Sequence, residues 1–553
     1  MTEVLNPKAM SKKTIPPPPR NVTLEKDIFN RKYLYLIAFI EGGSVMAIEL
    51  AGAKMIAPFF GTSLYVWASV LAVTLGGLAA GYFAGGWATF RFPAMKMLFW
   101  ELLAGTLLIA LMPFLAVKFM SITGNLGLRL GSLLSSLSFM FLPLLCMGMI
   151  SPTIIQLQNQ EVKGTGKTTG TIYAISTVGG ITMTLLMGFY FLPEWGIRIS
   201  VFFTAFLLGS MVILVVFLGR KYKAVSAAGI FILVLLFLAS GKSFSDANVA
   251  GKYLYRGEGV LGQITIVETR GSDPIRTLFL NQIPQTQVDP RFLPASFLKY
   301  PHRIAMIASN KPDNSNALLI GLGGGNIAME LKKMGFSVDA IEYDKRMPGL
   351  AENYFGFKPD GINAYIDDGR HFIRTTHQKY DLVVIDVLNG EVQPHHMFTM
   401  ESFAEMKRIM EPDGMLIINN QGFLLGEHGL GARSVYKTLA ASGFRVKYFF
   451  AGDEKNSGDI HFIASPSDFT LSFTLPENIN GCCKNYPVDY QSLVLGIEMT
   501  SANNSLDVTD AELLTDDKPL LLTLYNYSNE EWRLNTMKSL LRGQMPPPVT
   551  FFH

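Results

Sequence analysis

Apolar residues fill the first half of the chain in long runs with few interruptions. A helix needs about 20 mainly apolar residues to cross the hydrocarbon core of a bilayer. Seven runs approach this length, at residues 33–57, 65–88, 97–119, 131–155, 169–193, 199–219 and 224–241, the last being the shortest. The pattern predicts an all-α transmembrane bundle of about seven spans, and so an integral membrane protein.

Near residue 250 the pattern changes to short strands, and then to strands that alternate with helices. Residues 263–268 alternate between polar and apolar as in a half-buried strand, and 277–280 is the expected hairpin partner. Further strands are predicted at 317–321, 337–342, 363–366, 381–386, 414–419, 445–450 and 460–464, and helices at 325–334, 346–354, 370–376, 400–410 and 431–442. This alternation indicates an α/β Rossmann-like domain with a mostly parallel, doubly wound sheet.

Composition supports this division of the 553-residue chain. It is 49% apolar and only 16% charged, and the charges are concentrated outside the apolar runs. The expected parts are a disordered tail, a transmembrane helical domain, a small β region, a Rossmann-like domain and a C-terminal tail, at residues 1–32, 33–241, 250–300, 301–530 and 531–553. The disordered tail is polar and contains a run of four prolines.

Charge and cysteine content exclude several classes of function. The net charge of +3 and the absence of a basic stripe argue against nucleic acid as a partner. The three cysteines, Cys146, Cys482 and Cys483, have no metal-binding spacing and form no disulfide framework, so we expect no metal. The adjacent pair Cys482 and Cys483 is interpreted as two ordinary thiols, with redox activity as the alternative.

Three acidic residues, Glu41, Glu49 and Glu101, fall within or at the edge of the apolar runs. An ionised carboxylate in hydrocarbon is costly unless it is paired or protonated. One interpretation is a polar path or cation site inside the bundle, centred on Glu49. The other is that Glu41 and Glu101 lie near an interface while Glu49 pairs with a polar neighbour.

Four groups of residues at predicted strand ends carry candidate chemistry. The first strand leads into the glycine-rich turn Gly321–Leu322–Gly323–Gly324–Gly325, which permits close approach of a ligand. The second ends at Glu342, where an acid can accept hydrogen bonds from ribose hydroxyls. The third ends at Asp367 and Asp368, near an adenine amino group, and the fourth at Asp386. Each alone is equally typical of a turn or helix cap, but together they predict one adenosine-binding cleft.

With these residues in place, the segment from about Gln263 to Pro519 resembles the spermidine synthase family, and more specifically its membrane-fused branch. The glycine turn, Ile341–Glu342–Tyr343–Asp344, Asp368–Gly369–Arg370 and Asp386 are similar to family motifs. Two membrane segments, 60–67 and 173–180, and the late segment Thr515–Pro519 resemble that branch as well.

The resemblance implies a fold of the S-adenosylmethionine-dependent transferase type and an aminopropyl transfer. A polyamine amine attacks the sulfonium carbon of decarboxylated S-adenosylmethionine, and methylthioadenosine leaves. The enzyme orients the amine and removes its proton. It further implies cosubstrate binding by Gln263, Gly321, Gly323, Gly325, Glu342, Asp367 and Asp368, and a possible homodimer. Gln263 could equally be an edge polar residue, and Tyr253 and Tyr255 could cover the cleft or simply pack.

Departures from the family pattern affect the reacting end. The catalytic motif corresponds to Asp386 and Asn389, and a neutral amide at 389 cannot act as a base. Gly324 stands where an acid is usual, so ordinary S-adenosylmethionine becomes a possible cosubstrate, and a lyase that releases methylthioadenosine a possible activity. The family's His-Glu pair is not evident around residues 296–300. His395 or His396 could replace the lost base, although a solvated loop pair is the simpler interpretation.

The basic residues raise a conflict about topology. They cluster at alternate ends of the spans: Lys8, Lys12, Lys13, Arg20, Lys26, Arg31 and Lys32, then Arg91 and Lys96, Lys163 and Lys167, and Arg220, Lys221 and Lys223. The positive-inside rule assigns these ends to the cytoplasm. Seven spans would then put the α/β domain outside, whereas a nucleotide cosubstrate favours the cytoplasmic side of a bacterial inner membrane. We favour the cytoplasmic side.

Two other functions compete with the enzyme. The first is a transporter or sensor of a polyamine or other small cation, with a catalytically degenerate nucleotide-binding domain; the neutral Asn389 favours it. The second is a methyltransferase, which would share the glycine turn and ribose acid. The upstream β hairpin and the segment Thr515–Pro519 argue against a methyltransferase.

Overall fold

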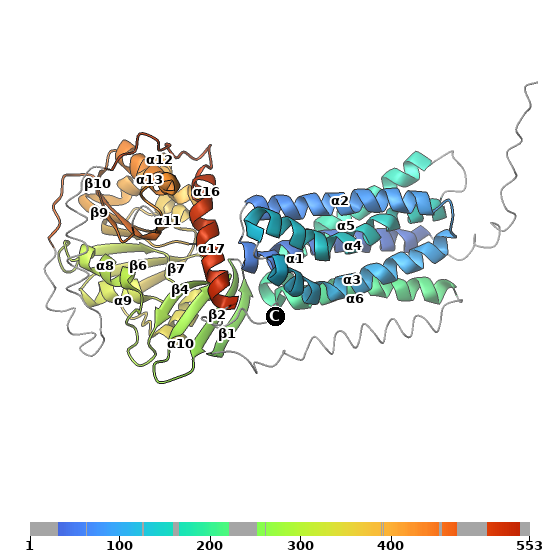
Figure 1. Ribbon diagram of the computed structural model, residues 1–553, viewed down its shortest axis with the longest axis horizontal. Coiled ribbons are helices and arrows are strands. Elements are labelled where there is room, and N and C mark those ends of the chain that lie inside the picture. The colour runs from blue at the N-terminus through green and yellow to red at the C-terminus, as the bar shows by residue number, and fades with distance from the viewer. Residues whose placement is uncertain are drawn as a thin grey trace, which may run out of the picture.

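The protein consists of a helical bundle and an α/β domain that lie end to end (Figure 1). The computed structural model describes residues 31–61, 64–123, 126–158, 165–219, 251–259, 261–388, 390, 392–452, 456–472 and 506–541. The C-terminal helix of the described chain lies between the two parts, in red in Figure 1.

The bundle contains the first six predicted spans. Its helices are α1 (Arg31–Phe60), α2 (Leu64–Ala88), α3 (Ala94–Thr123), α4 (Gly127–Gln158), α5 (Thr165–Leu186) and α6 (Gly196–Gly219), with the π-helical segment η2 (Met187–Trp195) between the last two. By length and composition, five helical runs could cross a membrane, and the longest, Thr165–Val216, contains α5, η2 and α6. The predicted seventh span, 224–241, lies outside the described residues.

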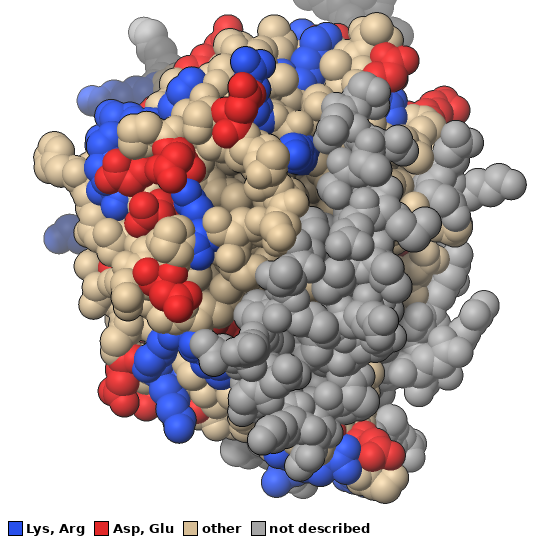
Figure 2. All heavy atoms as spheres, turned by 90° about the vertical axis from the view of Figure 1, so that its left-hand side faces the viewer, with Lys and Arg blue, Asp and Glu red and all other residues tan. Residues whose placement is uncertain are grey.

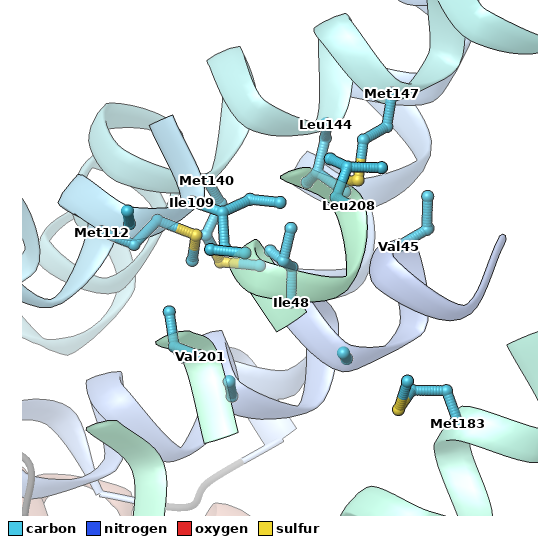
Figure 3. Close-up of a cluster of buried hydrophobic side chains, with 14 of the residues drawn as sticks. Val45, Ile48, Ile109, Met112, Met140, Leu144, Met147, Met183, Val201 and Leu208 are labelled. Carbon is cyan, nitrogen blue, oxygen red and sulfur yellow. The ribbon is translucent and has the colours of Figure 1, made fainter. Parts of the chain in front are cut away.

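Small residues set the spacing of the bundle helices. A Cβ on Gly81 of α2 would overlap the backbone of α4 at Leu145 and Gly148, and one on Gly42 of α1 would overlap Ser176 of α5. In lipid, where water does not drive apolar surfaces together, such close approach gives helices their packing energy. Figure 3 shows the resulting core, in which long flexible side chains such as Met112, Met140 and Met147 fill the space between helices.

Glu41 and Glu101 are buried inside the bundle, whereas one of the two interpretations placed them near an interface. Glu41 is only 1% exposed and accepts a hydrogen bond from the Ser176 hydroxyl at 2.9 Å. Glu101 is 5% exposed; its Oε1 accepts a bond from Thr153, and its Oε2 has no hydrogen-bond partner among the described residues. Glu49 is partly exposed. Glu41 and Glu101, rather than Glu49, are therefore the enclosed carboxyl groups.

One end of the bundle contacts the α/β domain, and we call it the near end. It includes Pro58 at the end of α1, whose carbonyl accepts a bond from Arg533, and Glu194 of η2, which pairs with Lys345 at 3.2 Å. Because the helices follow one another up and down (Figure 1), Arg31, Arg91, Lys96 and Lys167 lie at the opposite, remote end.

The predicted hairpin is part of a four-stranded antiparallel sheet in the order β1-β2-β3-β4. Its strands are β1 (Gly251–Gly259), β2 (Gly262–Thr269), β3 (Arg276–Leu280) and β4 (Ile283–Val288). Strands β2 and β3 pair as expected, and their inward apolar side chains pack against α10. The sequence did not predict β1 and β4.

The main sheet has seven strands in the order β10-β11-β9-β8-β5-β6-β7. They are β5 (Asn316–Ile320), β6 (Ser337–Glu342), β7 (Ile362–Ile366), β8 (Tyr380–Ile385), β9 (Met410–Gly422), β10 (Arg445–Phe450) and β11 (Gly458–Ser465). Strands β9, β8, β5, β6 and β7 are parallel to one another, and β11 and β10 complete the sheet in antiparallel fashion. The predicted Rossmann-like, mostly parallel sheet is confirmed.

Helices cover the sheet, and two separate apolar cores fill its two faces. The helices are α8 (Lys299–Ala308), α9 (Asn326–Lys333), α10 (Met347–Phe355), α11 (Gly369–Thr375), α12 (Met400–Ile409), α13 (Leu430–Ala441), α16 (Leu521–Leu524) and α17 (Asn526–Leu541), with short 3₁₀ turns at His395–Met397 and Glu427–Gly429. Helix α17 continues through residue 531, where the sequence placed the start of a tail.

The outer face of the α/β domain, remote from the bundle, mixes acidic and basic side chains (Figure 2). On the described part of that face, neither sign forms a continuous area.

Candidate active site

A cleft of about 620 Å³ lies at the carboxyl ends of β5, β6, β7 and β8. Open α/β sheets bind ligands at this edge. Strand β4 of the small sheet and helix α17 supply further walls. The predicted residues that line the cleft are Gly321, Gly323, Glu342, Asp367, Asp368 and Asp386. Gly324, at the position where the family usually has an acid, and His396 line it as well.

The glycine-rich turn forms the floor of the cleft between β5 and α9. Gly321 has φ +96°, and a Cβ there would collide with the carbonyl oxygen of Asp386, so only glycine fits. Thr286 of β4 reaches over the turn, and its hydroxyl accepts the N–H of Gly324 at 3.1 Å. A side chain longer than glycine at 324 would meet Thr286. Thr286, which the sequence did not predict as a site residue, therefore covers the turn.

Glu342 lies at the end of β6 beside this turn. Its Oε2 accepts the N–H of Leu322 at 3.1 Å, and its Oε1 accepts the N–H of Asp344 at 2.8 Å. Burial raises the pKa of Glu342, and these backbone hydrogen bonds counteract part of the rise. The carboxylate thus holds the turn in shape while it faces the cleft, which is compatible with the predicted contact to ribose hydroxyls.

Asp367 and Asp368 follow β7 and differ in what they bind. Asp368 caps α11, because its Oδ1 accepts the N–H groups of Arg370 and His371 at 3.0 Å each. Asp367 pairs with the His371 ring at 2.8 Å. His396 lies 3.5 Å from the other oxygen of Asp368. The helix-cap alternative therefore applies to Asp368, and its Oδ2 still faces the cleft side.

Asp386 follows β8 at the other end of the cleft. Its Oδ1 accepts a hydrogen bond from the Asn419 side-chain amide at 2.8 Å. Burial raises its pKa to about 6, and the Asn419 bond opposes that rise. Tyr300 of α8 lies close enough that Asp386 and Asp459 add to the burial that raises the tyrosine pKa well above its usual value. A carboxyl group with a pKa near neutrality is suited to accept a proton.

Asp459 of β11 also lines the cleft, but its charge is already balanced. It forms a salt bridge of 2.6 Å with Arg303 of α8, and the Arg303 side chain is almost fully buried. Thr286, Tyr300, Asn419 and Asp459 are thus site residues that the motifs did not indicate. Each comes from an element outside the β5–β8 series, and only the fold brings these elements to the cleft.

Two predicted cosubstrate contacts do not line the cleft. Gln263 pairs through its backbone with Asn281 in the turn between β3 and β4, and Gly325, with φ +79°, caps the start of α9 and packs on Phe357. Asn389 lies outside the described residues. Tyr253 and Tyr255 also lie away from the cleft, where Tyr253 stacks on Arg256.

The late segment Thr515–Pro519 supports the cleft from behind. Asp516 accepts bonds from Arg370 at 2.5 and 2.7 Å, and the Thr399 hydroxyl donates to it at 2.7 Å. His395 contacts the Thr515 carbonyl at 3.0 Å, so His395 stabilises this segment and only His396 remains at the cleft. Arg370 lies in the first turn of α11, two residues after Asp368, so the segment holds the start of this helix in position.

No group of three or more His, Cys, Asp or Glu side chains among the residues that the structure describes could hold a metal ion.

Residues 300–451 match the spermine/spermidine synthase domain family. The chain carries a spermidine synthase domain in its C-terminal region. The match covers β5 to β10, including the glycine turn and the four predicted acids Glu342, Asp367, Asp368 and Asp386. The N-terminal helical region precedes this domain and contains the long apolar helices.

Individual relatives resemble this spermidine synthase domain over a short length. A polyamine aminopropyltransferase of Vibrio vulnificus (strain CMCP6) is 33% identical over 114 residues, which is 20% of this chain and 38% of the relative. A probable polyamine aminopropyl transferase of Bifidobacterium longum (strain NCC 2705) is 24% identical over 216 residues, 37% of this chain and 46% of the relative. The chain thus spans less than half the length of these curated relatives.

Among solved structures, the spermidine synthase from Thermotoga maritima is similar to this chain. The two share 17% sequence identity with a TM-score of 0.35, over 50% of this chain and 88% of that one.

Proposed function

We propose that the protein is a membrane-anchored aminopropyltransferase of the membrane-fused spermidine synthase branch. The observation that carries this proposal is the position of Asp386. It is a carboxyl group with a raised pKa that shares one cleft with the glycine turn, Glu342, Asp367 and Asp368. The two relatives described above are transferases by name, so a transferase is proposed and a lyase is not.

The donor is a sulfonium nucleoside, either decarboxylated S-adenosylmethionine or S-adenosylmethionine itself. Its ribose hydroxyls would face Glu342, and its adenine would face Asp367 and Asp368. Gly324 leaves no negative charge at the turn, so a donor carboxylate would meet no repulsion there.

The reaction needs little covalent help from the protein. The acceptor amine nitrogen forms a bond to the carbon beside the sulfonium, and the carbon–sulfur bond breaks with its electron pair going to sulfur, which releases methylthioadenosine. The amine proton passes to the carboxylate of Asp386. Asn419 keeps that carboxylate oriented, and Tyr300 encloses it on the α8 side.

The direct test is release of methylthioadenosine by the purified protein. Each donor is supplied with a panel of amines that includes putrescine and spermidine, and the product is measured by mass spectrometry. We expect release with at least one donor–amine pair. Absence of release with either donor and every amine would contradict the proposal.

A specific observation favours a second function, a transporter or sensor of a small cation. The carboxyl group of Glu101 is enclosed in the bundle, and its Oε2 has no hydrogen-bond partner among the described residues. Buried ionisable groups of this kind are frequent on ion and proton pathways. Cation flux into proteoliposomes that disappears in Glu101→Gln, in a protein that releases no methylthioadenosine, would support this function over the first.

Two arguments about the side of the membrane disagree, and one experiment separates them. A cytoplasmic donor places the α/β domain in the cytoplasm of a bacterial cell, which we propose. The basic residues at the remote end argue for the opposite orientation. In a background with Cys146, Cys482 and Cys483 changed to serine, Ser272→Cys on the β2–β3 turn should resist an impermeant maleimide in intact cells. Phe90→Cys at the remote end should react, and the reverse pattern would overturn the cytoplasmic placement.

A possible homodimer and a polyamine acceptor complete the proposal. Size-exclusion chromatography with light scattering tests the first, and the amine panel tests the second.

A further inference from the structure

Thr286 of β4 occupies the space that a side chain at position 324 would need. A Cβ on Gly324 would lie 2.5 Å from the Thr286 Cγ2 and 3.1 Å from its Oγ1. Thr286 is only 3% exposed, and its hydroxyl accepts the Gly324 N–H at 3.1 Å, so packing on all sides keeps it in place. An acidic side chain at position 324 would therefore not fit in this cleft unless Thr286 moved.

The start of α8 brings a positive charge to the cleft. Lys299 is the first residue of this helix, and its side chain lines the cleft. Two hydrogen bonds fasten the segment to β4. The Phe297 N–H donates to the Gln287 carbonyl at 2.8 Å, and the Tyr300 hydroxyl donates to the Gln285 carbonyl at 3.3 Å.

Lys299 and Thr286 belong to one wall of the cleft, because Thr286 lies between the two β4 residues that hold the start of α8. The Thr286 oxygen accepts the Gly324 N–H, and the hydroxyl group has a hydrogen of its own to donate. A lysine ammonium is a donor as well, and its hydrogen bonds to a carboxylate are among the strong ones. This wall suits a carboxylate, whereas Lys299 would repel an ammonium group.

The tail of the proposed donor would extend to this wall. Its adenine is expected at Asp367 and Asp368 and its ribose at Glu342, so the tail on the sulfonium passes the glycine turn, where Gly323 and Gly324 line the cleft. Strand β4 covers that turn. The free end of the tail would therefore meet Thr286 and Lys299.

We propose that the donor is S-adenosylmethionine itself, and that Lys299 selects it by binding its carboxylate together with Thr286. This inference rests on the proposed transferase function and specifies the donor of the same site. The acceptor nitrogen bonds to the carbon beside the sulfonium, the carbon–sulfur bond breaks with its electron pair going to sulfur, and the amine proton passes to Asp386. Methylthioadenosine leaves, and the acceptor gains an aminocarboxypropyl group.

The first experiment compares the binding of the two donors in the absence of an acceptor. Calorimetry on the purified full-length protein in nanodiscs measures the Kd of S-adenosylmethionine and of its decarboxylated form. We expect S-adenosylmethionine to bind about tenfold more tightly, the usual effect of one hydrogen bond to a charged group. Equal affinities, or a preference for the decarboxylated donor, would overturn the proposal. A wall that binds a carboxylate of the acceptor instead would also give equal affinities here.

Substitutions at Lys299 test whether this residue makes the selection. Lys299→Met keeps the length of the side chain without its charge and should remove the preference, and Lys299→Arg should retain most of it. Lys299→Glu should favour the decarboxylated donor. Lys358→Met, on an exposed position that does not line the cleft, is the control and should leave both affinities unchanged. A tenfold preference that persists in Lys299→Met would overturn the role of Lys299.

A pair of substitutions tests the role of Thr286. Gly324→Asp alone should weaken the binding of both donors, because the new side chain meets Thr286. Thr286→Ala makes room for it, so the double variant should bind the decarboxylated donor more tightly than S-adenosylmethionine. Tight binding of the decarboxylated donor to Gly324→Asp alone would contradict the steric argument.

Failure of the transferase proposal would be recognised separately, by mass spectrometry of the products formed with each donor and the amine panel. Release of methylthioadenosine from the decarboxylated donor alone would retain the transferase and reject the selection by Lys299. A preference for S-adenosylmethionine that depends on Lys299, in a protein that releases no methylthioadenosine, would retain the donor site and reject the transferase. If neither donor binds, both proposals are overturned.

Discussion

The bundle and the α/β domain both enclose carboxyl groups, but the hydrogen-bond partners of these groups differ. In the cleft, Glu342 accepts two backbone N–H groups, and Asp386 accepts a side-chain amide. In the bundle, Glu41 has a serine hydroxyl, and one oxygen of Glu101 has no partner among the described residues. Hydrogen-bond donors favour the ionised form of a carboxyl group, and their absence favours the protonated form. The carboxyl groups of the cleft therefore have amide donors, whereas those of Glu41 and Glu101 have hydroxyl donors alone among the described residues.

The largest effect should come from removing the acid at the reacting end. Asp386→Asn keeps the shape of the side chain but cannot accept the amine proton. We expect methylthioadenosine release to fall by about 100- to 10,000-fold, the usual loss for a general base. Asp381→Asn is the matched control at the opposite end of the same strand, where Asp381 accepts the N–H of Asn316 at 2.8 Å. Full turnover in Asp386→Asn would remove this residue from the mechanism and weaken the contrast between the two regions.

The second effect tests packing in the bundle. Gly81→Ala adds a Cβ that must displace the backbone of α4, whereas Gly76→Ala points into open space. We expect Gly81→Ala to destabilise the bundle by about 2–3 kcal/mol and Gly76→Ala to have little effect. Thermal unfolding followed by size-exclusion chromatography in detergent measures the difference. Equal unfolding temperatures would show that the close approach of α2 and α4 contributes nothing to stability.

The third effect concerns the contact between the two regions. Arg533→Gln removes donors from the carbonyls of Pro58 and Asn281, and a buried carbonyl left unpaired costs about 1–2 kcal/mol. We expect faster protease cleavage between the bundle and the α/β domain, and a lower unfolding temperature. Arg445→Gln, which breaks an exposed ion pair with Asp468 on the edge strand β10, is the control and should have little effect. If the two variants behave alike, α17 does not hold the regions together.

The sequence predicted the parallel strands and their acidic ends because both follow from local pattern. Alternating strands and helices place consecutive strand ends at one edge, so Glu342, Asp367, Asp368 and Asp386 were expected to meet, and they line one cleft. Gln263 was taken from a family motif, yet the register of the small sheet brings β4 over the glycine turn instead. That register depends on packing between sheets, which a single strand does not reveal.

Less could be predicted about α17, for a related reason. The segment from Asn526 to Leu541 has no clear apolar face. Its sequence therefore predicted a tail that starts at residue 531 rather than a helix that continues through it. The helix is positioned by contacts with two other parts of the chain, at Pro58 and at Asn281. Residues that join distant elements have no signature in local periodicity, so the contacts of α17 with both regions became visible only in three dimensions.

The smallest effect should be a shift in the pH dependence of turnover. Burial raises the pKa of Asp386 to about 6, and the Asn419 amide lowers it in part. Since the carboxylate is the active form, turnover should rise with pH through a limb near pH 6. Asn419→Ala removes the opposing bond, so the limb should move up by roughly 0.5–1 pH unit. Rates measured from pH 4.5 to 9 in the native protein and in Asn419→Ala would define this limb in each.

A matched variant shows whether that shift belongs to the cleft. Asn363 donates to Asp339 at 2.8 Å, in a pair of the same kind that lies away from the cleft, so Asn363→Ala should leave the limb unchanged. Stability should respond with the same sign as the raised pKa. The folded protein binds the Asp386 proton more tightly than the unfolded chain, so this contribution is complete below about pH 4 and is lost as pH rises through about 6. A limb that moved down in Asn419→Ala would mean that the amide favours the protonated acid, and Asp386 would then resemble the enclosed carboxyl groups of the bundle.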